Sequence, residues 1–112
     1  MSINAIVQGC TWDGGTTVRP DPGQQVSDVV ADLTGASVVA ELYDATGVLL
    51  VALDVSIDPP TRLISFGLTR VVTALLPIRG QCVIDVRVTT SDGRVLAIDV
   101  GDRVRVQRFT SG

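Results

Sequence analysis

Apolar and polar residues alternate along much of the chain, most regularly between residues 82 and 106. In this stretch, CVIDVRVTTSDGRVLAIDVGDRVRV, every second residue from Cys82 to Val88 is apolar, with Asp85 and Arg87 between them. A period of two is typical of a β-strand with one buried face. The pair Asp92-Gly93 favours positive backbone φ angles, so we predict a tight hairpin inside this stretch.

The same alternation predicts further strands, which end at turn-forming residues. Asp44 and Gly47 occupy the favoured ends of a four-residue turn. Pro59 and Pro60 stop a strand because proline has no N–H to donate to the ladder. The additional predicted strands are residues 3–12, 37–44, 48–57 and 62–68.

Two segments do not alternate. Thr69 is suited to cap a helix, apolar residues follow at helical spacing and Pro77 ends the pattern, so we expect one short helix near residues 69–76. Residues 13–28, DGGTTVRPDPGQQVSD, are rich in Gly, Pro and polar residues. They are expected to form the longest loop, with a short extended piece near residues 26–30.

About seven or eight antiparallel strands, frequent turns and one short helix together predict an all-β sandwich. The chain has 112 residues, which fits a single domain spanning residues 1–112. Apolar residues make up 46% of it but aromatic residues only 4%, so Val, Leu, Ile and Ala must fill the core. That bias toward β-branched residues favours a pleated core.

The charges are unusual, because all nine basic residues are Arg and there is no His. The net charge is −3, and a nucleic-acid-binding protein normally carries a basic surface. A local patch of Arg103, Arg105 and Arg108 would lie beside Asp99 and Asp102. We therefore expect no nucleic-acid partner.

The first ten residues, MSINAIVQGC, lack the basic and apolar regions of a signal peptide. No window approaches the length of a membrane span. We therefore expect synthesis in the cytoplasm and no membrane partner. Cys10 and Cys82 are then expected to be reduced thiols, with a disulfide between them as the alternative.

No catalytic or metal-binding pattern is present in the sequence. Without His or Lys, the usual general base and the phosphate-binding lysine are missing. Asp85 and Asp99 fall on neighbouring predicted strands, but both lie beside arginines and are expected to form cross-strand Asp–Arg pairs on a solvent-exposed face. Asp28 and Asp32 lack the spacing of a calcium loop. We expect no enzyme activity, no metal and no cofactor.

Trp12 is the only Trp in the chain. An exposed Trp on a sandwich would suggest stacking against a sugar, whereas a single Trp in a chain poor in aromatics is more often a core residue. We expect Trp12 in the core.

Several short motifs occur in a fixed order along the chain: Asp32 to Ala36, Leu68-Thr69, Thr73-Ala74-Leu75, Gly80, Asp85-Val86, Asp92 to Arg94 and Gly101. Their order resembles that in the small immunoglobulin-like domain of tailed-bacteriophage virion proteins. The chain is similar to the N-terminal domain of upper baseplate proteins and to stand-alone proteins encoded near tail or fibre genes. Cys10 departs from the usual Asp, Cys82 from an expected aromatic residue, and the loop 13–31 is longer than usual.

This resemblance implies an immunoglobulin-like fold and a structural role in a tailed-phage virion. The chain would be an accessory module of the tail, baseplate or fibre attachment, located in the virion and docked to other virion proteins in a symmetric assembly. One alternative is a capsid decoration protein or head fibre base. Another is a carbohydrate-binding module that contacts a host-surface glycan during adhesion. The resemblance supplies no catalytic residues.

Two segments are the predicted contacts with a partner protein. The loop 13–31 contains two prolines, which lower the entropy lost when it becomes ordered. The C-terminal end becomes exposed if the last strand lies at a sheet edge. The predicted contact residues are Arg19, Asp21, Gln24, Gln25, Arg105, Arg108 and Phe109.

Overall fold

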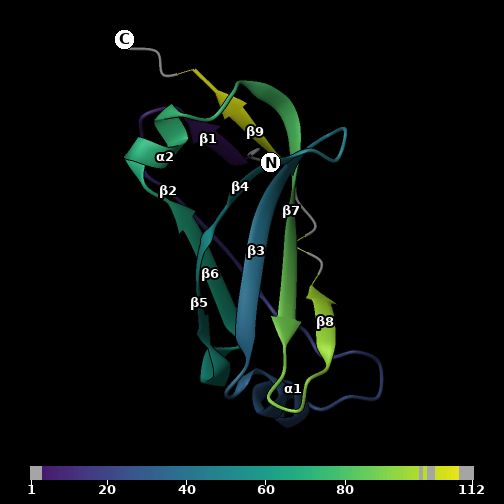
Figure 1. The fold of residues 1–112 in the computed structure, drawn as a ribbon. Coiled ribbons are helices and arrows are strands. Elements are labelled where there is room, and N and C mark those ends of the chain that lie inside the picture. Colours follow the sequence, from purple (N-terminus) through teal and green to yellow (C-terminus); the bar gives the residue numbers. More distant parts are fainter. Residues whose placement is uncertain (1–3, 99, 101–102, 109–112) are drawn as a thin grey trace.

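The computed structural model describes residues 4–98, 100 and 103–108, and these form a β-sandwich of two sheets (Figure 1). The large sheet has the order β1-β9-β7-β3-β4, with β8 also paired to β7, and the small sheet has the order β2-β6-β5. The predicted all-β sandwich is confirmed, although the described residues form nine strands instead of seven or eight. Their bounds are β1 Asn4–Val7, β2 Trp12–Thr17, β3 Ser37–Asp44, β4 Leu49–Ala52, β5 Asp54–Asp58, β6 Leu63–Leu68, β7 Arg79–Thr89, β8 Val95–Ile98 and β9 Arg103–Gln107.

One hydrophobic cluster fills the space between the sheets. It extends from Ile6 in β1 to Val106 in β9 and consists mainly of aliphatic side chains, as the composition predicted. Fully buried members such as Leu42, Ile64 and Val86 come from the inward positions of both sheets. The expectation of a single domain over residues 1–112 stays a prediction.

Strand β7 is the longest strand and organises the large sheet. Its first half pairs with β9 and its second half, from Val86 to Thr89, pairs with β8. The predicted hairpin is therefore present, but only Gly93 takes a positive φ, of 92°. Asp92 does not, because the turn closes through the Thr90 carbonyl, which accepts from Gly93 N–H at 3.0 Å.

The predicted opening strand, residues 3–12, is wrong as one element. The chain forms β1, turns at Gly9 with a φ of 80°, and enters the other sheet as β2. β1 pairs with β9 in parallel, so the sandwich is not wholly antiparallel as expected.

The predicted strand 48–57 also divides between the sheets. β4 pairs with β3 in the large sheet, whereas β5 pairs with β6 in the small one. Leu53 lies between them, buried, and its N–H donates to the Ala40 carbonyl at 2.8 Å. The strand therefore crosses from one sheet to the other without losing its inward-outward alternation.

The predicted loop 13–28 is confirmed only for residues 18–25. Its start belongs to β2, and its end begins helix α1 (Val26–Leu33), where we expected an extended piece. Val29 and Leu33 bury one face of the helix, and the Asp28 carboxylate accepts from Gln25 N–H at 3.0 Å at its start. The carboxylate satisfies one of the N–H groups that a helix start leaves unpaired.

The predicted helix near residues 69–76 is confirmed as α2 (Arg70–Ala74), and Thr69 caps it through a bond from Val72 N–H at 3.4 Å. A short 3₁₀ turn, η1 (Pro59–Thr61), joins β5 to β6. The buried Thr73 hydroxyl donates to the Cys10 carbonyl at 2.8 Å, so α2 is tied to the turn between β1 and β2.

The β3–β4 turn makes stability sensitive to acid. Asp44 Oδ1 accepts from Thr46 N–H, the Thr46 hydroxyl and Val48 N–H at 2.9, 2.6 and 3.0 Å. The Thr46 hydroxyl, followed by the Val48 N–H, holds the pKa of Asp44 below its ordinary value. A lowered carboxyl pKa stabilises the folded state above the unfolded-state pKa, and this contribution is lost as pH falls through the folded-state pKa.

We therefore expect the free energy of unfolding to decrease when the pH is lowered below about 4. Asp44→Asn keeps an acceptor oxygen but cannot titrate, so its loss of stability between neutral and acidic pH should be smaller than that of the wild type. Urea unfolding at both pH values measures this. Equal losses in the two proteins would exclude Asp44 as a contributor.

Candidate binding groove

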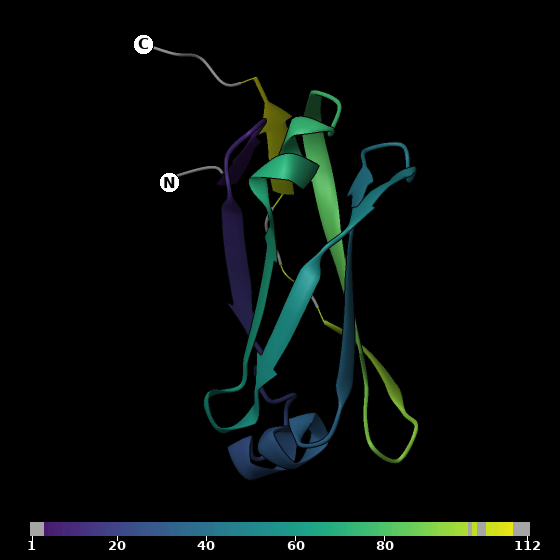
Figure 2. The same cartoon turned by 60° about the vertical axis from the view of Figure 1, so that its left-hand side comes forward.

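A groove of about 890 Å³ opens on the side of the sandwich between β2 of the small sheet and β8 of the large sheet. Its walls are the end of β2, the segment from Val18 to Gln24, one face of α1, and β8 with Val100. Helix α1, which forms part of the groove wall, lies at the opposite end of the molecule from α2 (Figure 2).

The floor of the groove is apolar and only partly covered. Val18, Leu96, Ile98 and Val100 pack against the core but keep part of their surface exposed. A chain segment lying over them would remove this apolar surface from water, which is favourable by about 25 cal/mol per Å².

Polar contacts close the end of the groove at α1. Asp32 Oδ1 lies 2.5 Å from an Arg94 guanidinium nitrogen, and the Gln24 amide donates to Asp32 Oδ2 at 3.4 Å. Arg94 also contacts Asp92 at 3.2 Å. The Thr90 hydroxyl, and then Arg94, hold the pKa of Asp92 below its ordinary value. These contacts join the β7–β8 turn to the helix.

The outer edge of β8 has unpaired backbone groups. Thr90 N–H donates to the Arg94 carbonyl at 2.8 Å, which makes these residues a hydrogen-bonded pair between β7 and β8. Such pairs alternate along an antiparallel ladder, so Leu96 and Ile98 also point their backbone groups at β7. Val95 and Ala97 therefore point theirs away, and no described residue pairs with that edge.

The outer edge of β2 follows the same rule. Val18 N–H donates to the Arg62 carbonyl at 2.8 Å, in register with the β2–β6 ladder. The N–H and C=O groups of Asp13, Gly15 and Thr17 therefore point away from β6. Within the described part of the chain, both strands beside the groove are sheet edges.

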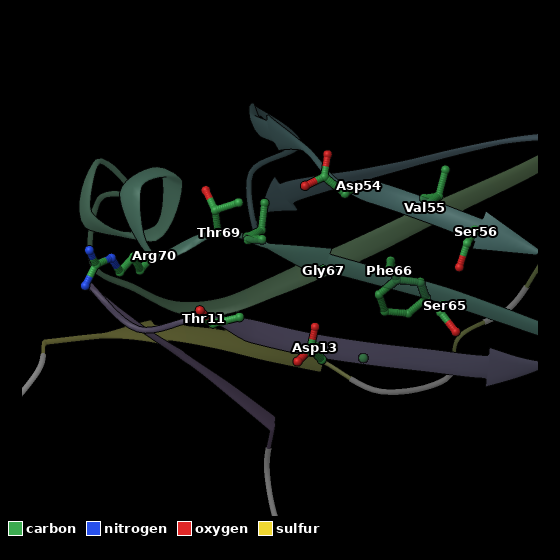
Figure 3. Close-up of a pocket in the computed structure, with 12 residues that line it drawn as sticks. Thr11, Asp13, Asp54, Val55, Ser56, Ser65, Phe66, Gly67, Thr69 and Arg70 are labelled. Carbon is green, nitrogen blue, oxygen red and sulfur yellow. The ribbon is translucent and has the colours of Figure 1, made fainter.

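A second, shallower basin of about 740 Å³ lies on the small sheet and is lined largely by its outer face (Figure 3). Asp13 and Asp54 stand on either side of Gly67, which is in register with both. Ser56 and Ser65, which are directly opposite each other on β5 and β6, also line the basin. Among the described residues no cluster of three His, Cys, Asp or Glu could hold a metal ion. Two exposed carboxylates without a third group do not form a recognisable catalytic site.

The predicted contact residues divide between the two ends of the molecule. Arg19, Asp21 and Gln24 line the groove, whereas Gln25 precedes α1 and is exposed. The side-chain carbonyl oxygen of Gln24 accepts a hydrogen bond from Asp21 N–H at 3.0 Å, which holds this segment in a turn. Three of the four predicted residues in this part of the chain therefore line the groove, together with β8 and Arg94, which the sequence analysis did not single out as contacts.

The C-terminal group lies elsewhere. Arg105 on β9 and Arg108 beyond it are exposed near the end that carries α2 (Figure 1). Phe109 lies outside the described residues. Leu75 of the α2 end is 81% exposed and Val71 67%, so apolar and cationic side chains both occur at this end. The structure does not bring the two predicted groups together.

Asp85 forms a surface ion pair, but its partner Arg87 lies on the same strand, β7, and not on a neighbouring strand as expected. Asp85 lies 3.2 Å from Arg87, which also contacts Glu41 on β3 at 2.9 Å. The Glu41 carboxylate accepts a hydrogen bond from Tyr43 and raises the pKa of that phenol. Asp99, its predicted counterpart, lies outside the described residues.

Trp12 is in the core, as predicted, and its ring stacks on Phe66 with centroids 5.9 Å apart. The buried ring offers no platform to a sugar. Cys82 is buried, which raises the pKa of its thiol, and Cys10 is partly exposed. Both are free thiols in this structure, and their reduced state in solution stays a prediction.

Comparisons with known proteins give a distant structural likeness. No family model matches the chain, and no curated protein matches it. The chain resembles the crystal structure of CopC from Methylosinus trichosporium OB3b, with 21% identity and a TM-score of 0.38. The match covers 66% of this chain and 65% of the CopC chain, so this chain spans less than two thirds of the length of CopC.

The resemblance to tailed-phage virion proteins is therefore wrong. The structural likeness that the comparison found is to CopC and not to a virion protein. The structural role in the tail, baseplate, fibre or capsid falls with that resemblance, as does the alternative of a host-adhesion module. Among the described residues, no helix has the length and apolar character needed to cross a membrane.

Proposed function

We propose that the protein is a non-catalytic binding module that holds a segment of another protein in the groove between β2 and β8. The observation that carries this proposal is the half-buried apolar floor of Val18, Leu96, Ile98 and Val100, open along the side of the sandwich. Grooves that combine apolar side chains with polar groups that orient a ligand are typical binding sites.

The rim of the groove supplies polar and charged groups for orientation. Arg19 and Asp21 are exposed at its mouth, and Arg94 is held in place by Asp32 and Asp92. Fixed rim charges favour one partner over others more than they add affinity. The absence of nucleic-acid and membrane partners, and synthesis in the cytoplasm, remain predictions.

Site-specific photo-crosslinking in the native cell tests this proposal. A photoreactive amino acid at Arg19 lies on the groove rim, whereas one at Ser56, also exposed, lies on the outer face of the small sheet. We expect a discrete adduct with one partner protein from position 19 and none from position 56. Adducts from position 56 alone, equal adducts from both, or none from either would contradict the proposal.

A further inference from the structure

The edge of β8 differs from the other edge beside the groove. Its residues Val95 to Ile98, sequence VLAI, contain no charge, and Val95 is 64% exposed. Natural sheet edges are usually protected by charged residues, proline or bulges, because unpaired backbone groups bind other strands. β2 carries Asp13 within its edge and continues to Arg19. Of the two edges, β8 is the unprotected one.

A strand position is also vacant beside β8. β8 and β9 lie on the same side of β7, and β1 covers β9 along Asn4–Val7. No described strand covers β8 in the same way. A strand placed there would continue the large sheet and would face β2 and Val18 across the groove.

We propose that the partner segment binds as an extended strand added to the edge of β8. This inference rests on the proposed binding function and names its mode. The backbone of the segment would exchange hydrogen bonds with the N–H and C=O groups of Val95 and Ala97, the two residues whose backbone faces the open edge.

The groove also defines the side chains of the segment. Successive side chains of a strand point to opposite faces, so every second one would enter the groove and cover Leu96, Ile98 and Val18. Those positions require apolar residues of Val or Leu size. The remaining side chains of the segment would lie on the same face of the sheet as the exposed Val95 and Ala97. They would face solvent, so polar residues are suited to these positions.

Proline substitutions separate strand addition from other modes of binding. Ala97→Pro removes one outward N–H, and proline is tolerated at a sheet edge where its missing N–H faces solvent. Ala97→Ser changes the same side chain but keeps the N–H. Asp13→Pro makes the equivalent change on the edge of β2, at a residue that does not line the groove. Unfolding midpoints and circular dichroism establish that each variant is folded.

The probe is a library of random linear peptides of about ten residues, displayed and selected on the wild-type protein. We expect enriched peptides with alternating apolar residues, which bind Ala97→Ser and Asp13→Pro as they bind the wild type. Binding to Ala97→Pro should weaken about tenfold or more. If Ala97→Pro does not fold, hydrogen exchange of the wild type replaces it, with peptide-induced protection expected at the Val95 and Ala97 amides.

Undiminished binding to Ala97→Pro, or protection confined to Gly15 and Thr17, would overturn the assignment to β8. Selection of no peptide would overturn strand addition as well. These failures differ from failure of the proposed function, because an adduct from position 19 can still form when the partner binds the groove in another conformation.

Discussion

Replacing Trp12 by alanine is expected to lower the free energy of unfolding by about 3–5 kcal/mol, the usual cost of truncating a buried Trp. The side chain is 8% exposed, and its ring stacks on Phe66 between the two sheets. An added Cβ at Gly14 would lie 2.8 Å from the Phe66 ring and 3.1 Å from the Trp12 ring. The two rings therefore occupy the space that the glycine leaves open.

Chemical unfolding followed by circular dichroism measures this loss, and Trp12→Phe is the matched control. The smaller ring keeps the contact with Phe66, so its cost should be clearly lower than that of alanine. Because a domain of this size is stable by only about 5–15 kcal/mol, the alanine variant should melt far below the wild type. An unchanged unfolding midpoint for Trp12→Ala would show that the ring lies outside the core.

The sandwich was predictable because the alternation of apolar and polar residues can be recognised in the sequence even when the partner strands are not known. That same property concealed the crossing at Leu53, where the inward-outward order continues while the pairing changes from β3 to β6. The pattern reports which face is buried, but it does not report which sheet the strand joins.

Other elements were missed for different reasons. The sequence DGGTT has the composition of a loop, yet it lies in β2 because Gly14 makes room for the aromatic pair. Tertiary packing here overrides strand propensity. Helix α1 did leave a sign in the sequence, since Val26, Val29 and Leu33 recur at helical spacing before Gly35, whose φ is 72°. The prolines and polar residues preceding it obscured this pattern.

The groove was beyond sequence reasoning. Its two edges, β2 and β8, come from opposite ends of the chain, and only the crossing of the chain between sheets places them side by side. The prediction that residues 13–31 contact a partner located one wall of the groove and stays untested. The opposite wall, β8, belongs to the hairpin predicted within residues 82–106. The regular alternation of that stretch indicated a strand but not that its edge is exposed.

Leu33→Ala is expected to lower the free energy of unfolding by about 2–5 kcal/mol. Leu33 is 1% exposed in the last turn of α1, and together with Val29 it anchors the helix on the core. The same side chain lines the groove. Its truncation should therefore loosen the helix that closes the end of the groove, and the α1 amides should exchange faster with solvent.

Val26→Ala is the matched control, because Val26 begins the same helix but is 49% exposed. A surface substitution of this kind usually changes stability by no more than about 0.5 kcal/mol. Urea unfolding of both variants compares the two positions directly, since each change removes apolar atoms from one helix. Equal costs would mean that α1 does not pack on the core, and the groove would then lack the wall that Asp32 and Leu33 provide.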